Sequence, residues 1–173
     1  MKNIFIHKTA EISKGTIIGT DTKIWHYTQI REKVVIGKNC IIGRNVYIDF
    51  ETTIGNNCKI QNNSLLYHKT ILEDGVFIGP QVTITNDITP RAIDEKGKLK
   101  TSDDWIAGTV TIKYGASIGA GAIILPNITI GKYAMIGAGS VVTHDVNDYA
   151  LVYGNPAKEH GKVDQNGRIV KRF

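Results

Sequence analysis

An isoleucine or leucine recurs every sixth residue along most of this chain. One series runs unbroken from Ile6 to Ile84, and a second runs from Ile106 to Val142. The fourth residue after each of these is nearly always small or β-branched, with Ile128 as the oversized exception; examples are Thr16, Thr22, Thr28, Val34, Cys40, Val46, Thr52, Cys58, Ser64, Val110, Ala116, Ala122 and Ala134. The apolar face of an α-helix recurs about every 3.6 residues, so a helix does not explain a period of six.

A stack of triangular coils does explain this period. Each hexad supplies one short strand and one corner, with the isoleucine pointing inward and the small residue filling the bend. Three hexads close a coil of eighteen residues, and successive coils stack at the β spacing of about 4.8 Å. Each coil then buries its apolar face against its neighbours. The sequence therefore predicts an all-β parallel β-helix of about seven coils, while its handedness does not follow from counting.

Residues 85–105 interrupt the period. This stretch, TNDITPRAIDEKGKLKTSDDW, is polar and contains Pro90 and Gly97. Long irregular loops in a compact repeat are usually functional or disordered, and we interpret this one as a loop extruded from a corner. The period ends after Val142. We therefore expect a β-helix domain over residues 1–147 and a cap over residues 148–173, with a terminal hairpin turning at Gln165-Asn166-Gly167.

Composition and charge narrow the class of protein. The 173 residues are 42% hydrophobic and only 8% aromatic, which suits one domain with an aliphatic core. The net charge of +5 favours anionic partners, but no basic stripe or nucleic-acid-binding module is apparent. No apolar run approaches the roughly 20 residues that span a bilayer, and no secretory signal is apparent at the N-terminus. We expect a soluble cytoplasmic protein without nucleic-acid or membrane partners.

The cysteines illustrate the register. Cys40 and Cys58 are eighteen residues apart, so they stack at equivalent inward corners. A disulfide between them is geometrically conceivable, but small corner residues in a reducing compartment are the expected role.

His68 and Asn86 are the residues most suited to catalysis. They are eighteen apart, so His68 is expected to lie one coil from Asn86, where the loop departs. Imidazole titrates near neutrality and can act as a general base; the alternative is an exposed histidine in a turn. If the loop is a simple corner insertion, this column continues through Ala120 and Ala138.

The stretches IGAGAI and IGAGSV offer backbone N–H groups that no large side chain covers. They include Gly119, Ala120, Gly137 and Ala138. A pantetheine arm could lie along such a track, although glycine and alanine also suit tight corners. A further column contains His26, Arg44 and Asn62, which favours either a subunit interface or a substrate wall.

Over roughly residues 6–147 the hexads resemble those of the hexapeptide-repeat acyltransferases. Four stretches resemble one branch, the nucleotide-sugar N-acetyltransferases that act on a 3-amino sugar. These stretches are KIWHYTQI at 23–30, NNCKIQNNSLLYH at 56–68, GPQVTITNDITPR at 79–91 and YALVYGNPAK at 149–158.

The resemblance implies a left-handed β-helix and a homotrimer with three active sites between neighbouring subunits. It implies acetyl-CoA as co-substrate along the C-terminal coils, on the glycine and alanine track and near Asn155, Pro156 and Lys158. A UDP- or dTDP-linked amino sugar is expected near the loop, in a pathway for surface polysaccharide or another glycan. Asn86 is expected beside the reacting amine, and the candidate substrate-binding residues are Arg31, Tyr67, Thr85 and Arg91.

The expected mechanism is direct attack of the neutral amine on the thioester, with backbone N–H groups steadying the oxyanion. Many relatives have an acidic residue where this chain has His68, and some let the departing thiolate take the proton. His68 is therefore expected either to accept the proton or to position the amine, and no metal is expected.

Three other functions remain open at this stage. The first is an acyltransferase for another acceptor, a hydroxyl or a 4-amino sugar. The second is a zinc enzyme like the γ-class carbonic anhydrase, which needs three convergent histidines; no triad is evident among His7, His26, His68, His144 and His160. The third is a non-catalytic scaffold.

Overall fold

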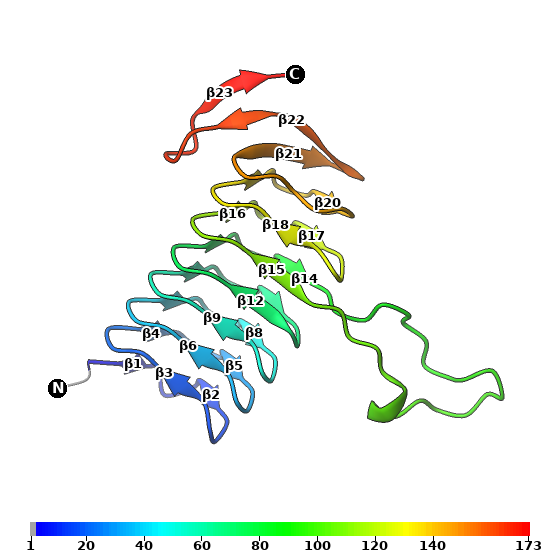
Figure 1. Cartoon of the computed structure of the whole chain (residues 1–173). Helices are drawn as coiled ribbons and strands as arrows, with labels where there is room; N and C mark the ends of the chain where they lie inside the picture. The colour runs from blue at the N-terminus through cyan, green and yellow to red at the C-terminus, as the bar shows by residue number, and fades with distance from the viewer. Residues whose placement is uncertain (1–2) are drawn as a thin grey trace.

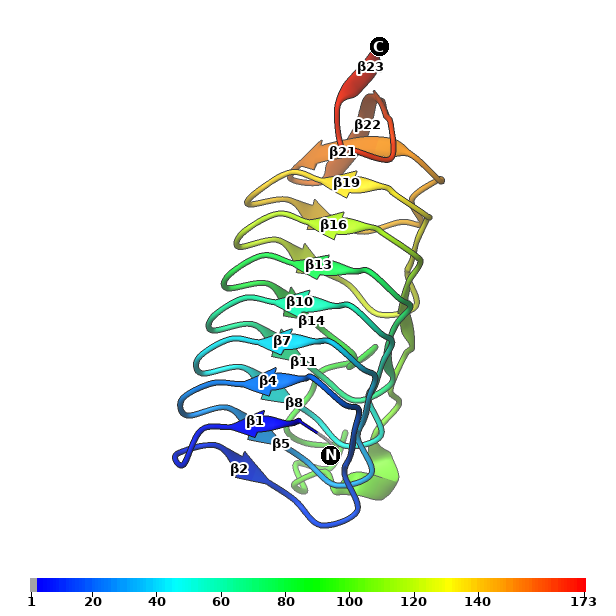
Figure 2. The same cartoon turned by 90° about the vertical axis from the view of Figure 1, so that its left-hand side faces the viewer.

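The computed structural model describes residues 3–173, and the chain winds upward as a three-sided prism from which one long loop projects (Figure 1). Short strands alternate with turns, and the described residues contain only one helical segment, the 3-10 turn η1 at Ser102–Asp104. The strands form three sheets, one for each face. The chain visits the three sheets in rotation, and its coils wind as a left-handed parallel β-helix (Figure 2).

The first sheet has ten strands: β1 (Phe5–Ile6), β4 (Lys23–Ile24), β7 (Ile41–Ile42), β10 (Lys59–Ile60), β13 (Phe77–Ile78), β16 (Ser117–Ile118), β19 (Met135–Ile136), β21 (Ala150–Gly154), β22 (Ala157–Val163) and β23 (Ile169–Arg172). The second has seven: β2 (Glu11–Ile12), β5 (Gln29–Ile30), β8 (Tyr47–Ile48), β11 (Leu65–Leu66), β14 (Thr83–Ile84), β17 (Ile123–Ile124) and β20 (Val141–Val142). The third has six: β3 (Ile17–Ile18), β6 (Val35–Ile36), β9 (Thr53–Ile54), β12 (Thr70–Leu72), β15 (Val110–Ile112) and β18 (Thr129–Ile130).

The predicted inward ladders are confirmed. Ile24 pairs with Ile42, and Ile42 pairs with Ile60, each eighteen residues apart in parallel register. These isoleucines are fully buried, as are the small corner residues from Thr22 upward, among them Cys40 and Cys58, whose thiols are free. In the first coil Ile6 is still 45% exposed, so the tightly packed core begins at the second coil.

The corners have a backbone conformation that sequence analysis did not identify. The third residue after the inward residue adopts a positive φ, for example 63° at Asn39 and 58° at Asn57. Asparagine and glycine tolerate this conformation best, which explains their frequency here. Where glycine directly follows the inward residue, the coils approach closely: a Cβ at Gly37 would lie 2.6 Å from the carbonyl carbon of Gly55.

The loop leaves the prism after β14 and returns before β15. Ile84 pairs with Ile124, forty residues on instead of eighteen, so the loop adds 22 residues to its coil. An antiparallel bridge between Asp87 and Ala107 closes its base. Counting Ile106 as an inward hexad residue was wrong: it lies on the returning arm of the loop and is 59% exposed.

The C-terminal segment caps the upper end. β21 continues the first sheet by pairing in parallel with β19, and β22 and β23 then fold back in antiparallel order. The predicted terminal hairpin is confirmed, since the Asp164 carboxylate accepts the backbone N–H groups of Asn166 and Arg168 around its turn. No helix within residues 3–173 is long and apolar enough to cross a membrane.

Candidate active site

Each edge of the prism carries its own columns of side chains. We call the edge after the first sheet the first corner and the edge after the second sheet the second corner. At the second corner, the second residue after each inward residue gives the column Lys14, Glu32, Phe50, His68, Asn86, Pro126 and His144. The loop emerges from this column directly after Asn86.

The predicted continuation of this column through Ala120 and Ala138 is wrong. Ile118 belongs to the first sheet and pairs with Ile78, so Ala120 follows Pro80 on the first corner. The error arose from counting Ile106 as an inward residue, which moves every later hexad forward by one face. Ala120 and Ala138 instead extend the column of His26, Arg44 and Asn62.

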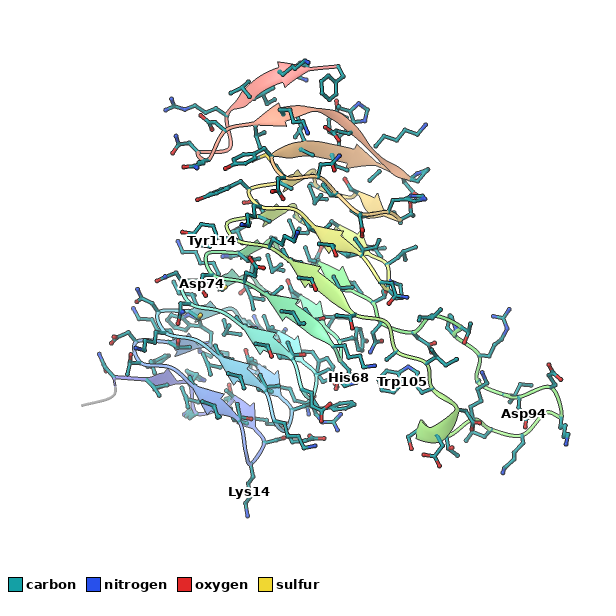
Figure 3. All side chains as sticks on the ribbon, viewed as in Figure 1. Lys14, His68, Asp74, Asp94, Trp105 and Tyr114 are labelled. Carbon is teal, nitrogen blue, oxygen red and sulfur yellow. The ribbon has the colours of Figure 1, made fainter. Side chains whose placement is uncertain are left out.

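His68 is 7% exposed and its ring is held on several sides. Its Nδ1 lies 3.1 Å from the backbone carbonyl oxygen of Phe50. A carbonyl only accepts, so in the neutral ring Nδ1 carries the proton and Nε2 keeps its lone pair. The imidazole stacks on the Phe50 ring with 4.0 Å between the ring centroids. The Trp105 ring of the loop lies 5.3 Å from the imidazole, and Figure 3 shows Trp105 beside His68 where the loop meets the prism. This is an imidazole fixed in the tautomer that a general base needs.

Asn86 lies against His68, as the eighteen-residue spacing predicted. The Asn86 side chain is buried, and its Nδ2 donates to the backbone carbonyl of His68 at 3.4 Å. Its backbone carbonyl accepts from Gly108 at 2.7 Å, which ties the returning arm of the loop to this point. Its Oδ1 accepts no hydrogen bond from residues 3–173, so this oxygen can accept one from an amine.

Asp49 is a central part of this corner that sequence analysis missed. Its side chain is buried, and Oδ1 accepts from the Tyr47 hydroxyl at 2.9 Å and the Phe50 N–H at 2.9 Å. Its Oδ2 accepts from the His68 N–H at 3.2 Å. Burial and the Asp49 carboxylate raise the pKa of Tyr47. Asp49 thus holds the backbone N–H of Phe50, whose carbonyl meets Nδ1, and the backbone N–H of His68 itself.

The four predicted substrate-binding residues occupy three different settings. Arg31 is paired with Glu32 at 2.8 Å and Asp49 at 3.4 Å, and its guanidinium lies 5.5 Å over the Phe50 ring. Tyr67 and Thr85 stand next to His68 and Asn86, but the Thr85 hydroxyl donates to Ile124 within the prism. Arg91 is exposed on the loop.

The loop encloses a hollow of about 230 Å³ beside this corner. Its lining residues are Asp87, Thr89, Arg91, Lys100, Thr101, Ser102, Asp104 and Trp105. Trp105 therefore contacts both the hollow and the His68 ring. Asp104 caps η1 by accepting the Thr101 N–H at 2.9 Å, and this bond lowers the pKa of Asp104.

A second carboxylate lies near His68. Glu51 Oε2 is 3.9 Å from His68 Nδ1, and its other oxygen is paired with Lys33 at 3.0 Å. The pairing with Lys33 lowers the pKa of Glu51. The corner therefore places a second carboxylate beside the His68 ring.

The predicted cofactor-binding residues lie on the first corner. A Cβ at Gly119 would fall 2.5 Å from the backbone nitrogen of Ala138, and one at Gly137 would fall 2.6 Å from the Tyr153 Cβ, so both glycines are required by tight coils. A Cβ at Gly121 or at Gly139, in contrast, would have no atom within 4 Å and would face open space.

The remaining predicted cofactor-binding residues lie in the turn at the top of the first corner. Gly154 donates its N–H to the Ser140 hydroxyl, and the cis Asn155-Pro156 peptide follows. Asn155, Pro156 and Lys158 are exposed there. The cofactor candidates thus follow one edge, a full prism face from His68. A face of six residues spans up to roughly 20 Å.

Among residues 3–173, no three histidine, cysteine, aspartate or glutamate side chains gather in a way that could hold a metal ion.

This chain is similar to known proteins in sequence and in fold. The sequence pattern of the family described as bacterial transferase hexapeptide (six repeats) matches residues 2–49, 51–86 and 109–144. Over 58 residues, 34% of this chain and 30% of the relative, the sequence is 59% identical to dTDP-3-amino-3,6-dideoxy-alpha-D-galactopyranose 3-N-acetyltransferase of Aneurinibacillus thermoaerophilus. Over 96 residues, 55% of this chain and 39% of the relative, it is 42% identical to serine acetyltransferase of Bacillus subtilis (strain 168). The chain therefore matches well under half the length of either relative.

A solved structure shares the fold. It is a GDP-perosamine N-acetyl transferase variant from Caulobacter crescentus in complex with CoA and GDP-perosamine, with a TM-score of 0.64 and 22% identity. The likeness covers 92% of this chain and 57% of that one.

Proposed function

The chain belongs to the bacterial transferase hexapeptide family, and from this premise we propose that it is an acyl-CoA-dependent N-acyltransferase for a nucleotide-linked amino sugar. The proposed acyl group is acetyl, and the proposed acceptor is the 3-amino group of a UDP- or dTDP-linked sugar in the cytoplasm. The 59% identity to an enzyme named for a dTDP-3-amino sugar supports this acceptor.

The observation that carries the proposal is the state of His68. With Nδ1–H donated to the Phe50 carbonyl, Nε2 is free to take the proton that the amine loses on attack. Asn86 Oδ1 is suited to accept a hydrogen bond from the same amine and so to orient its lone pair toward the thioester carbon. The carbon–sulfur bond then breaks, and coenzyme A leaves as the thiolate or takes the proton back from His68.

The separation of the candidate residues supports a site formed between copies of the chain. His68 and Asn86 are on the second corner, whereas the glycine track and the Asn155-Pro156 turn are on the first. A thioester bound along that track in one chain does not reach the His68 of the same chain around a prism face. We therefore propose a homotrimer in which the second corner of each subunit faces the first corner of the next.

The test is release of free thiol from acetyl-CoA with a panel of acceptors. The panel contains UDP- and dTDP-linked 3-amino and 4-amino sugars, together with L-serine and a galactoside as hydroxyl acceptors. We expect turnover with one 3-amino sugar, and a loss of kcat on the order of a hundredfold or more in His68→Ala and in Asn86→Ala, since general-base catalysis contributes about 10²–10⁴-fold. His144→Ala is the matched control, because His144 is an exposed histidine in the same column.

Turnover that survives both substitutions would place the chemistry at another corner. Turnover only with a hydroxyl acceptor would keep the acyltransferase and reject the amino sugar. No thiol release from any pair, with a folded oligomer, would favour the non-catalytic scaffold.

A further inference from the structure

A second hollow lies on the first corner, below the glycine track. It has a volume of about 270 Å³ and is lined by Trp25, His26, Ile41, Gly43, Arg44, Ile60, Gln61 and Asn62. We call it the lower hollow. It is separate from the hollow of the loop, with which it shares no lining residue.

Aromatic rings form one wall of the lower hollow. The Trp25 and His26 rings are nearly parallel, with an interplanar angle of 7°, and His7 stacks on His26 at 3.5 Å. Phe5 supports the Trp25 ring from the coil below at 5.3 Å. Trp25 is nevertheless 38% exposed, so an indole held in place by its neighbours remains available for stacking on a planar ligand.

Hydrogen-bond donors form the other wall. The Arg44 guanidinium lies 5.6 Å over the Tyr27 ring and has no carboxylate partner among residues 3–173. Asn62 Oδ1 accepts the backbone N–H of Arg44 at 2.8 Å, which leaves the Asn62 Nδ2 group to donate. The lining contains no carboxylate, whereas the hollow of the loop contains Asp87 and Asp104. The lower hollow is therefore the better of the two for an anion.

We propose that the lower hollow binds the nucleoside diphosphate of the acceptor substrate, a step that rests on the function proposed above. The base stacks on Trp25, the amides of Gln61 and Asn62 bond to its polar edge, and Arg44 pairs with the diphosphate. The volume suits one nucleoside and not a complete nucleotide sugar, since whole ligand pockets measure about 300–1,000 Å³. The sugar therefore extends out of the hollow.

The heights of these features along the prism agree with this assignment. Gln61 and Asn62 form the upper rim of the lower hollow and belong to the same coil as His68. The glycine track begins two coils higher, at Gly119, directly above the coil that contains Asn86. A nucleotide sugar extending upward and an acyl-CoA extending downward along this corner would meet at the height of His68 and Asn86 of a neighbouring copy.

The test is direct binding of nucleotides without any acyl transfer. Isothermal titration of the full chain with dTDP, UDP and coenzyme A would be combined with fluorescence of Trp25 in a Trp105→Phe background, since the chain has only these two tryptophans. We expect dTDP or UDP to quench Trp25, and we expect coenzyme A not to compete with it. Arg44→Gln should weaken nucleotide binding on the order of tenfold to a hundredfold through loss of a charge-assisted pair. Arg172→Gln, at an exposed arginine of β23, is the matched control and should leave nucleotide affinity unchanged. Arg91→Gln tests the hollow of the loop as the rival nucleotide site.

Three results would overturn the assignment: equal nucleotide affinity in Arg44→Gln and the unmodified chain, loss of affinity in Arg91→Gln instead, or competition by coenzyme A. None of these three results would exclude thiol release with a nucleotide sugar. The nucleotide site and the proposed acyltransferase function can therefore be rejected independently. Binding of no nucleotide, together with acyl transfer to serine or a galactoside, would reject both the lower hollow and the amino-sugar acceptor.

Discussion

At the scale of single residues, the buried Asp49 carboxylate organises the second corner. It receives donors from Tyr47, Arg31, Phe50 and His68. A buried carboxylate is stabilised only when such donors surround it. Asp49 is therefore a positioning residue for His68: it accepts the backbone N–H groups of Phe50 and His68 and makes no hydrogen bond to the ring itself.

We expect Asp49→Asn to lower kcat by about tenfold and stability by about 2–3 kcal/mol, because an amide NH₂ replaces an acceptor that several donors need. KM for acetyl-CoA should stay unchanged, since the Asp49 carboxylate is buried and bonds to none of the cofactor candidates. The measurements are steady-state kinetics as a function of pH and urea denaturation. A shift of the pH–rate profile is the decisive signature, because a purely structural role would not move it.

Asp145→Asn serves as the control for this prediction. Asp145 is an exposed aspartate higher on the same edge, where it accepts only the Thr129 N–H at 2.7 Å. Its loss should change stability by about 1 kcal/mol or less and leave kcat unaltered. If Asp49→Asn and Asp145→Asn behave alike, Asp49 does not position His68.

The residue scale also shows what the sequence could predict of the site. The juxtaposition of His68 and Asn86 followed from the eighteen-residue spacing, because both precede the loop and register is intact there. The same spacing places Asp49 beside Arg31, but it does not reveal that the carboxylate is buried or that Tyr47, Phe50 and His68 also donate to it. Trp105 was missed because contacts made by a 22-residue loop do not follow from the repeat.

At the scale of elements, the corners set how closely coils can stack. Two kinds of glycine occur there, those directly after the inward residue and those two positions later. Gly37 is of the first kind, with the backbone of Gly55 2.6 Å from its potential Cβ. Gly75 is of the second kind, with a φ of 72° and only ordinary contacts around its potential Cβ.

Gly37→Ala should therefore destabilise the chain by about 2–4 kcal/mol, since the added methyl group forces two coils apart. Gly75→Asn should be neutral within about 0.5 kcal/mol, because Asn39 and Asn57 occupy the same position in the coils below and already bond to each other at 3.1 Å. Urea denaturation of the two variants beside the parent checks both values. Equal destabilisation by the two changes would contradict the distinction between the two kinds of glycine.

The elements themselves were largely predictable, and the one failure has a physical cause. Fold and loop followed from the period and its interruption, since few architectures besides a β-helix place an inward isoleucine at every sixth residue. The terminal hairpin followed from the Gln165-Asn166-Gly167 turn. Ile106 fits that period by chance, although its backbone accepts from Ile88 across the loop and its side chain is mainly in solvent. Hydrophobicity alone does not distinguish such a residue from a true inward one, and the positions of Ala120 and Ala138 were consequently misassigned.

At the scale of the whole molecule, the loop is an addition to a prism that is complete without it. Thr83 and Ile84 pair directly with Ile123 and Ile124, so the coils above and below the loop are already in contact. The loop meets the prism mainly through Trp105 and through the Asp87–Ala107 bridge at its base. Stability and activity should therefore respond differently to its removal.

Replacing residues 88–106 by Asn-Gly, which closes the Asp87–Ala107 bridge as a hairpin, tests this separation. The shorter loop loses less entropy when it closes, which should stabilise the fold by about 2 kcal/mol. Loss of the Trp105 contacts should destabilise it by about 0.5–1.5 kcal/mol. We expect the free energy of unfolding to change by less than about 2 kcal/mol and acyl transfer to be abolished. Retained transfer would show that the loop is not part of the acceptor site, and a large loss of stability would show that it supports the core.

The eighteen-residue register also fixes the height of the prism in units of one coil. Coils touch only their neighbours, so a whole coil can be gained or lost without disturbing the side-chain columns, and each such change moves everything above it by about 4.8 Å. An inserted segment whose length is not a multiple of eighteen has to project from the prism as a loop, as the 22 additional residues after Ile84 do. The span between the lower hollow and the glycine track can thus change during evolution only in steps of one coil, and we expect related chains to differ in this span by whole coils.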